Sequence, residues 1–392
     1  MDKKSNKVTF TILSLSLLTV MAGAAMAPAL GVIKEHFSSY DDMLIQLIVS
    51  LPSFFIIITN LCFPVICKYF KTKTIAFTGL LIYTLAGSLA FFVSDIYVIL
   101  LLRAILGISV GMIMPLSTGL LSFYFPPEEQ ARLMGLSAAM SQLGGVIATL
   151  LAGLLANISW NCAFLVYLLG LISLVSVALF LPSEKLEVKG RISVKHLKRF
   201  HPSVIGMLLL MCIFFIFPTN FAITSSNTDK FRLSPNEITL IMVGLDVVAS
   251  LVGLVFGFFM AKIPKKVKYL APVLFLLGYL SYTLADGSML LIIGSVLIGL
   301  ANGIGIPYLN TIASVKGGKE AATTVMPLIS ASLYLGQFIS PLIVRPLSKI
   351  FFSQNDITSP YKIGVILCII FLIQMYLTRN QQALPPNEAK NK

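Results

Sequence analysis

The chain has 392 residues, of which 57% are hydrophobic and only 11% are charged. A soluble domain carries about 25% charged residues, so this composition excludes an ordinary soluble fold and predicts a protein surrounded mainly by lipid. The net charge of +13 would favour a nucleic-acid partner in a soluble protein, but the distribution of the positive charge described below argues against one.

Twelve apolar segments with few charges follow one another along the chain. Backbone groups in lipid must be paired within their own segment, and the alternation typical of barrel strands is absent, so each segment predicts a membrane-spanning helix. The first segment is too long for the core of a signal peptide and is interpreted as a retained helix. The predicted spans are Thr9–Ile33, Met43–Ile66, Ile75–Val93, Ile96–Phe123, Leu133–Ile158, Ala163–Leu181, Val204–Ile223, Ile238–Ile263, Leu270–Leu284, Met289–Val315, Ala322–Phe352 and Ile363–Leu377.

Lysine and arginine are unevenly distributed between the two sets of connecting segments. If the amino terminus is cytoplasmic, the inner segments hold 22 of these residues and the outer loops hold 5. Cytoplasmic loops of membrane proteins carry such an excess of positive charge. The sequence therefore predicts a multi-pass protein of the cell membrane with both termini cytoplasmic. The positive charge then faces the lipids of the inner leaflet and not a nucleic acid.

The most charged stretch, Ser183–Arg199, separates six predicted spans from six. It predicts a first half over residues 1–182, a cytoplasmic linker over 183–203 and a second half over 204–380, with a disordered tail over 381–392. The five cysteines have no metal-binding or disulfide spacing, and no phosphate-binding loop or clustered metal ligands occur. No cofactor or metal is expected, and ATP-driven transport lacks support.

The second half repeats the first. The segment with Gly107, Gly111 and Pro115 recurs 192 positions later with Gly299, Gly303 and Pro307, and the same offset relates Gly144 to Gly336. Glycines at this spacing predict close approach of neighbouring helices. The prolines predict bends in the fourth and tenth spans that serve gating or simple packing. Transporters commonly bind their substrate between two related halves.

Only Arg103, Asp246 and Arg345 are charges placed clearly within spans. Each is costly in lipid and needs a reason. All three lie about 10–12 Å below the outer ends of their helices, at 1.5 Å per residue, which predicts one shared site. A carboxyl group in apolar surroundings is a candidate proton carrier, and the alternative is a structural ion pair with one of the arginines.

Either arginine could bind an anionic substrate. The alternatives are a pair between Arg103 and Asp246, and an outward extension of Arg345 toward the membrane surface. Two arginines against one carboxylate favour an anionic or amphipathic substrate. Uncharged polar residues at mid-span either bind substrate or link helices, and they are Gln142, Asn302, Tyr334 and Gln337.

Several segments carry a resemblance to a known family. They are the basic turns Phe63–Lys71 and Gly257–Lys266, the pattern Arg103-x-x-x-Gly107-x-x-x-Gly111, and Trp160-Asn-Cys-Ala-Phe164. With six plus six helices and a basic central loop, the chain resembles the major facilitator superfamily, and in particular its bacterial drug and organic-compound:proton transporters. The resemblance implies an all-α membrane protein with two pseudo-symmetric six-helix bundles that works by alternating access.

The chain also departs from the family's pattern. Cys67 and Ala261 stand where the family's turns have aspartate, which implies a different or weaker cytoplasmic clasp between the halves. The Gly-Pro pattern of the fifth helix in drug/proton antiporters is absent, since the stretch Gly144–Gly153 contains no proline.

The function expected first is proton-coupled efflux of small hydrophobic or amphipathic organic molecules by a monomer that contacts protons and membrane lipids. The alternative is uptake or exchange of an amphipathic organic anion, such as a bile-acid-like carboxylate. A remote alternative is a receptor or an enzyme that transports nothing. Ser109 matches the Gly-x-Ser-x-Gly of serine hydrolases, but all three histidines lie outside the spans, so an enzyme is not expected.

Overall fold

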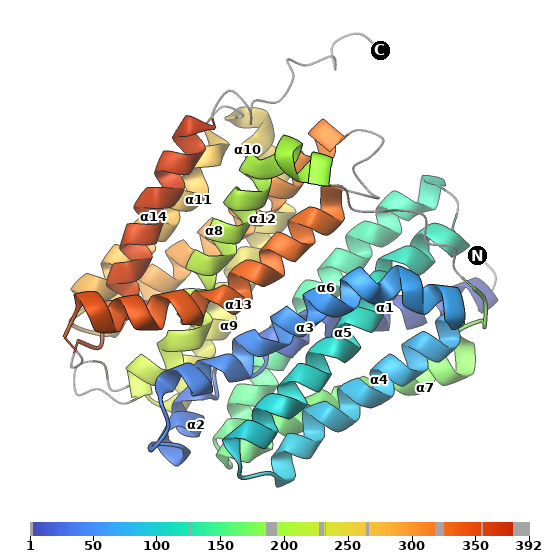
Figure 1. Cartoon of the computed structure of the whole chain (residues 1–392), viewed down its shortest axis with the longest axis horizontal. Coiled ribbons are helices and arrows are strands. Elements are labelled where there is room, and N and C mark those ends of the chain that lie inside the picture. Colours follow the sequence, from blue (N-terminus) through green and yellow to red (C-terminus); the bar gives the residue numbers. More distant parts are fainter. Residues whose placement is uncertain are drawn as a thin grey trace. The chain divides into compact units, whose positions relative to one another are not determined.

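The computed structural model describes residues 3–125, 127–185, 194–226, 231, 233–263, 266–317, 325–353 and 356–378. Every regular element within these ranges is a helix (Figure 1). The elements are α1 (Lys3–Ala24), α2 (Leu30–His36), α3 (Asp42–Tyr69), α4 (Thr72–Leu89), η1 (Ala90–Phe92), α5 (Ile96–Tyr124), α6 (Pro127–Ala156), η2 (Trp160–Leu169), α7 (Gly170–Phe180), α8 (Val194–Ser226), α9 (Pro235–Leu254), α10 (Phe256–Lys262), α11 (Val267–Leu284), α12 (Ser288–Gly317), α13 (Met326–Phe351) and α14 (Ser359–Leu377).

Within the described residues, 11 helical segments are long and apolar enough to cross a membrane. They correspond to the second through twelfth predicted spans. The two shortest predictions are longer in the structure, because α11 and α14 begin three and four residues earlier and reach 18 and 19 residues. The remaining apolar helix, Lys7–Gly23 within α1, is shorter.

The first predicted span, Thr9–Ile33, is wrong as a single helix. It is interrupted by the turn at residues 25–29, which contains Pro28. Proline has no backbone N–H and cannot continue the helical ladder. The amides of Ala29 and Leu30 instead bond back only three residues, at 3.1 and 3.3 Å. The chain resumes as a separate short helix, α2, at Leu30.

The eighth predicted span, Ile238–Ile263, is also divided. The helix α9 ends at Leu254 and α10 begins at Phe256. Gly253 and Gly257 flank this break, and each lowers helix stability by about 1 kcal/mol relative to alanine. The sixth span begins as the 3-10 helix η2 before it continues as α7.

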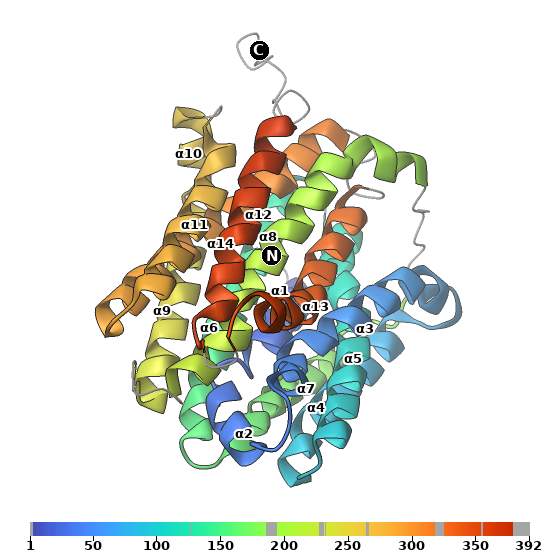
Figure 2. The same cartoon turned by 60° about the vertical axis from the view of Figure 1, so that its left-hand side comes forward.

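The chain forms two compact units. Unit 1 comprises Met1–Val188, Phe217–Asp246 and Pro341–Arg345, and unit 2 comprises Lys189–Ile216, Val247–Ser340 and Pro346–Lys392. In unit 1, α5 packs against α3, α4 and α1, and α6 packs against α1. In unit 2, α11 packs against both α12 and α14, and α11 and α14 lie side by side in Figure 1 and Figure 2. Unit 1 contains the whole predicted first half together with parts of α8, α9 and α13. The predicted halves themselves stay a prediction.

The internal repeat has a structural counterpart in each unit. On α6, Gly144 faces the Leu17 carbonyl of α1 so closely that a Cβ has no room. On α13, a Cβ at Gly336 would lie 2.5 Å from the Leu208 carbonyl oxygen of α8. The two glycines that the offset relates thus occupy the same kind of helix contact.

Three of the four glycines that the repeat relates in the fourth and tenth spans lie at similar contacts. In unit 1, Gly107 faces the Pro52 carbonyl of α3, and a Cβ at Gly111 would lie 2.5 Å from the Cβ of Thr59. In unit 2, Gly303 of α12 faces the Ala249 carbonyl. The helices α5 and α12 continue through Pro115 and Pro307, and a gating role of these prolines stays a prediction.

Gly144→Ala is expected to destabilise the protein by at least about 1–3 kcal/mol, because the added methyl group meets backbone that can move only with all of α1. Gly135→Ala on the same helix is the matched control, since a Cβ there meets nothing within 4 Å and alanine favours the helix. Thermal unfolding of the purified protein in detergent measures both. Equal unfolding temperatures for the two variants would contradict the close contact.

Candidate functional site

Asp246 lies in the middle of α9 and is half-buried. The Oγ1 of Thr149, a buried residue of α6, donates a hydrogen bond to its Oδ2 at 3.0 Å. A hydroxyl donor stabilises the carboxylate without neutralising it. A role of Asp246 in proton coupling stays a prediction.

The packing of α6 on α9 positions this carboxylate. One turn beyond Thr149, Gly153 lies directly against the side chain of Thr239. A further turn along, Asn157 Nδ2 donates to Asn236 Oδ1 at 2.5 Å. These three contacts run in opposite directions along the two helices, so α6 and α9 are antiparallel. The glycine allows the close approach that brings Thr149 to Asp246.

Arg103 on α5 is fully buried, with no exposed surface. Its Nη1 donates to Tyr167 Oη at 2.8 Å, and its Nη2 donates to the Gly87 carbonyl at 3.4 Å. The guanidinium carbon lies 5.1 Å from the ring centre of Phe164 and 4.6 Å from that of Tyr167. Such distances are typical of cation–π contacts. The cation is thus enclosed by aromatic rings and backbone.

Tyr167 extends this contact to α1. Its hydroxyl donates to the Ala22 carbonyl at 3.1 Å, two residues before α1 ends. On α4, Gly87 lies directly against the Tyr167 side chain, so a larger residue there would displace the ring. Arg103 and Tyr167 together tie α4, α5, η2 and the end of α1 into one packed region of unit 1.

Arg345 on α13 pairs with two aspartates at the start of α3. Its Nη2 lies 2.7 Å from Asp42 Oδ2, and its Nε lies 3.7 Å from Asp41 Oδ1. Lys34 of α2 lies 2.9 Å from the other oxygen of Asp42. Asp41 also caps α3 by accepting a hydrogen bond from the Met43 amide at 2.9 Å. Two carboxylates therefore balance the charge of Arg345 and that of Lys34.

A single site shared by all three charges stays a prediction, but an ion pair of Asp246 with Arg103 or Arg345 is not among the contacts that the structure describes. Arg103 binds Tyr167, Arg345 binds Asp42, and Asp246 accepts from Thr149. Depth along a helix was the basis of that expectation, and depth does not determine which neighbour a side chain faces. The surplus positive charge that favoured an anionic substrate is divided between the separate contacts of Arg103 and Arg345.

The four uncharged candidates lie in different places. Gln142 is exposed on α6 in unit 1. In unit 2, Asn302 on α12 has a buried Oδ1 with no hydrogen-bond partner. Gln337 on α13 is partly buried and its Nε2 lies 3.9 Å from Met211 Sδ, and Tyr334 lies one turn away on the same helix. An unpaired buried amide oxygen costs about 1–3 kcal/mol. Substrate binding by any of the four residues stays a prediction.

A buried amide pair in unit 1 was not predicted from the sequence. The Nε2 of Gln46 on α3 donates to Asn220 Oδ1 on α8 at 2.8 Å. Both side chains are buried, and Gln46 Oε1 has no hydrogen-bond partner. The signal was available, because an amide inside an apolar span needs a partner helix. Both residues lie near the ends of their predicted spans, whereas the candidates chosen from the sequence were polar residues at mid-span.

The chain is similar in sequence to a known protein family and to a curated bacterial protein. The sequence profile of the family described as "Major Facilitator Superfamily" matches residues 12–341. Quinolone resistance protein NorA of Staphylococcus aureus is 25% identical over 294 residues, which cover 70% of this chain and 73% of that protein.

Two solved structures are similar in fold. One is a bacterial homologue of the human lysosomal transporter Spinster in an inward-facing, unoccupied conformation, with a TM-score of 0.79 at 14% identity over 99% of this chain and 100% of the other. The other is nucleoside transporter NupG, with a TM-score of 0.73 at 16% identity over 96% of this chain and 100% of the other. At these identities the likeness shows the fold.

Proposed function

Since this chain belongs to the major facilitator superfamily and is a multi-pass membrane transporter, we propose that it expels small hydrophobic or amphipathic organic molecules in exchange for protons. The observation that carries the proposal is the carboxylate of Asp246, which is half-buried in a membrane helix and held by the Thr149 hydroxyl. A carboxyl group in such a place changes its charge when it binds one proton.

Asp246 is the proton carrier in this mechanism. Unprotonated, its negative charge attracts a substrate with a positive or polar group. Protonated, it is neutral and releases that substrate. Alternating access then requires that the carboxyl group meets one side of the membrane at a time. Exchange follows because proton and substrate compete for the same carboxylate.

The substrate class is inferred from similarity and from charge. The name of the matched S. aureus protein, a quinolone resistance protein, supports drug-like organic compounds. The earlier alternative, uptake or exchange of an organic anion, relied on surplus arginine charge. That charge is balanced at Arg345 and enclosed at Arg103. We therefore infer neutral or cationic amphipathic substrates.

The parts of α8, α9 and α13 in unit 1 supply the contacts that alternate. They include the amide pair of Gln46 and Asn220, the bond from Thr149 to Asp246, and the ion pair of Arg345 and Asp42. At Gly31 of α2 a Cβ would lie 2.8 Å from the Ala222 carbonyl of α8. In the proposed cycle these contacts form on one side of the membrane and break when that side opens. The excess of inner positive charge supports cytoplasmic termini and, with them, an outward position of this side.

Arg345→Gln is expected to change the transport rate about two- to fivefold, because a partly exposed ion pair contributes roughly 0.2–1 kcal/mol to one state of the cycle. Asp42→Asn should change it similarly. The effects of the two single variants should not add in the double variant, since both remove the Arg345–Asp42 pair, although Asp42→Asn also removes the contact with Lys34. Transport rates in proteoliposomes test this, and strictly additive effects would contradict a shared contact.

The proposed function is tested with a panel of cationic, neutral and anionic amphipathic compounds. Binding is measured as a rise in the thermal unfolding temperature of the purified protein, and transport as flux into proteoliposomes. Cationic and neutral compounds should both bind and move. Selective flux of organic anions would support the alternative function instead. Binding without flux of any compound would support a receptor and overturn the proposal.

A further inference from the structure

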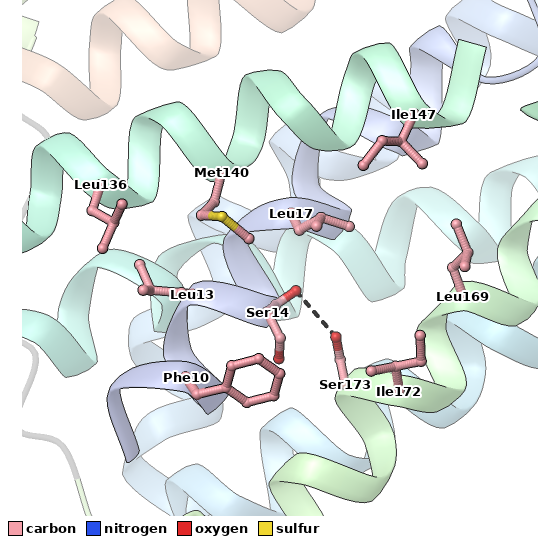
Figure 3. A pocket seen from close by; sticks show the side chains of 10 residues that line it. All are labelled: Phe10, Leu13, Ser14, Leu17, Leu136, Met140, Ile147, Leu169, Ile172 and Ser173. Atoms are coloured by element: carbon pink, nitrogen blue, oxygen red, sulfur yellow. Dashed lines mark hydrogen bonds between the residues drawn. The ribbon is translucent and has the colours of Figure 1, made fainter. Parts of the chain in front are cut away.

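A groove outside the candidate site runs along one side of unit 1 (Figure 3). Its volume is about 500 Å3, and it is formed by α1, α6, the end of η2 and α7. In Figure 3 side chains of α6 border one side of the groove and those of α1 and α7 border the other. The apolar lining includes Leu13, Leu17, Leu136, Met140, Ile147 and Ile172.

The two polar residues of the lining, Ser14 and Ser173, do not offer free hydroxyl groups. Ser14 Oγ donates to the Thr11 carbonyl at 2.7 Å, and Ser173 Oγ donates to the Ser14 carbonyl at 3.1 Å. Both hydrogens are therefore used within the protein. The groove offers almost entirely hydrocarbon surface to an occupant.

The groove is open on its outer side, where Phe10 is 56% and Ile172 is 59% exposed. Ile172 lies on a helical segment long and apolar enough to cross a membrane, and Phe10 lies on the shorter apolar helix Lys7–Gly23 packed beside it, so we take the solvent at this opening to be lipid. From Leu136 to Ile147 the groove follows α6 for about 16 Å, at 1.5 Å per residue. This elongated shape suits a linear hydrocarbon chain better than a broad ring system.

A cation lies beyond one end of the groove. Lys7 is exposed one turn before Phe10, and its Nζ lies 5.0 Å above the ring of Phe180 on α7. The helices α1 and α7 are antiparallel, because Ser14 meets Ser173 and Lys7 meets Phe180. Lys7 and Phe180 thus mark the same end. A lysine at a membrane surface attracts an anionic head group by about 1 kcal/mol.

We propose that this groove binds one acyl chain of an anionic phospholipid, whose phosphate head group contacts Lys7. The apolar lining selects the chain, and the lysine selects the charge. The bound lipid fills the space between α1, α6 and α7 and stabilises their packing. The site is separate from Asp246 and does not depend on the proposed transport function.

Native mass spectrometry of the full chain in detergent tests the proposal, with dioleoyl phosphatidylglycerol and dioleoyl phosphatidylcholine as probes. Phosphatidylglycerol should be retained at least about fivefold more strongly, which corresponds to one favourable lysine contact. Ile172→Trp fills the groove and should reduce retention of both lipids about tenfold. Lys7→Gln should remove only the preference for phosphatidylglycerol.

Matched controls separate this site from general lipid contact. Leu179→Trp changes an exposed residue of α7 outside the groove, and Lys71→Gln removes an exposed lysine elsewhere. Neither should alter retention. Because Lys7 is exposed, Lys7→Gln tests the proposal even if Ile172→Trp does not fold. Equal losses in the control variants, an unchanged preference in Lys7→Gln, or displacement of the lipid by transported compounds would overturn the proposal.

Discussion

Asp246→Asn is expected to abolish proton-driven transport while the protein stays folded and still binds substrate. Asparagine has nearly the same shape as aspartate and can still accept the hydrogen bond from Thr149. It cannot bind or release a proton. Accumulation of substrate against its gradient should therefore fall to the level of protein-free vesicles, while exchange of labelled for unlabelled substrate continues.

The control for Asp246→Asn lies on the same helix. Glu237 in the first turn of α9 accepts hydrogen bonds from the amide and hydroxyl of Ser234, both at 2.8 Å, and this exposed carboxylate serves to cap the helix. Glu237→Gln should transport like the native protein. Thr149→Val removes a bond to a charged group, worth about 1.5–3 kcal/mol, and should slow coupled transport about tenfold or more. Undiminished proton-driven accumulation by Asp246→Asn would exclude Asp246 as the carrier.

Arg103→Leu is expected to cause the largest loss of stability among the variants considered. Leucine leaves a cavity between the rings of Phe164 and Tyr167 and leaves the Gly87 carbonyl without its side-chain donor. Truncation of large buried side chains costs about 3–5 kcal/mol. Arg103→Lys keeps the charge but cannot reproduce the planar two-nitrogen contact, so it should restore stability only in part.

Thermal unfolding and size-exclusion chromatography in detergent measure this loss. Tyr167→Phe should also destabilise the protein, because it leaves the enclosed guanidinium and the Ala22 carbonyl without their hydroxyl partner. Arg345→Gln is the control, since that arginine is partly exposed and its loss should change stability little. Substrate binding by Arg103 stays a prediction. It would be favoured over the packing role if Arg103→Leu unfolded like the native protein but no longer bound anionic compounds.

The sequence predicted the membrane helices and the glycine contacts because both depend on local pattern. Hydropathy over some twenty residues is enough to find a span, and the offset between Gly144 and Gly336 is enough to predict equivalent contacts. The break at Pro28 was not predicted, although the proline is visible in the sequence. Hydropathy alone does not show whether a long apolar segment forms one helix or two.

The candidate site could be predicted only in part. The rarity of charges in spans identified Arg103, Asp246 and Arg345, but their partners depend on how each helix is rotated about its axis. Asp42 lies at the start of a helix and Tyr167 is one of many aromatic residues, so neither was distinguishable as the partner of an arginine. The three-dimensional packing supplied that information.

The exchange of protons for substrate is tested most directly in proteoliposomes with an imposed pH gradient and a fluorescent cationic amphipathic compound outside. With an acidic lumen, protons leave through the protein, and the compound should accumulate inside above the levels in protein-free vesicles and in vesicles with Asp246→Asn. A protonophore should abolish the difference, and a reversed gradient should produce no accumulation. Accumulation driven by external acid, or equal in native and Asp246→Asn vesicles, would contradict proton-coupled efflux through Asp246.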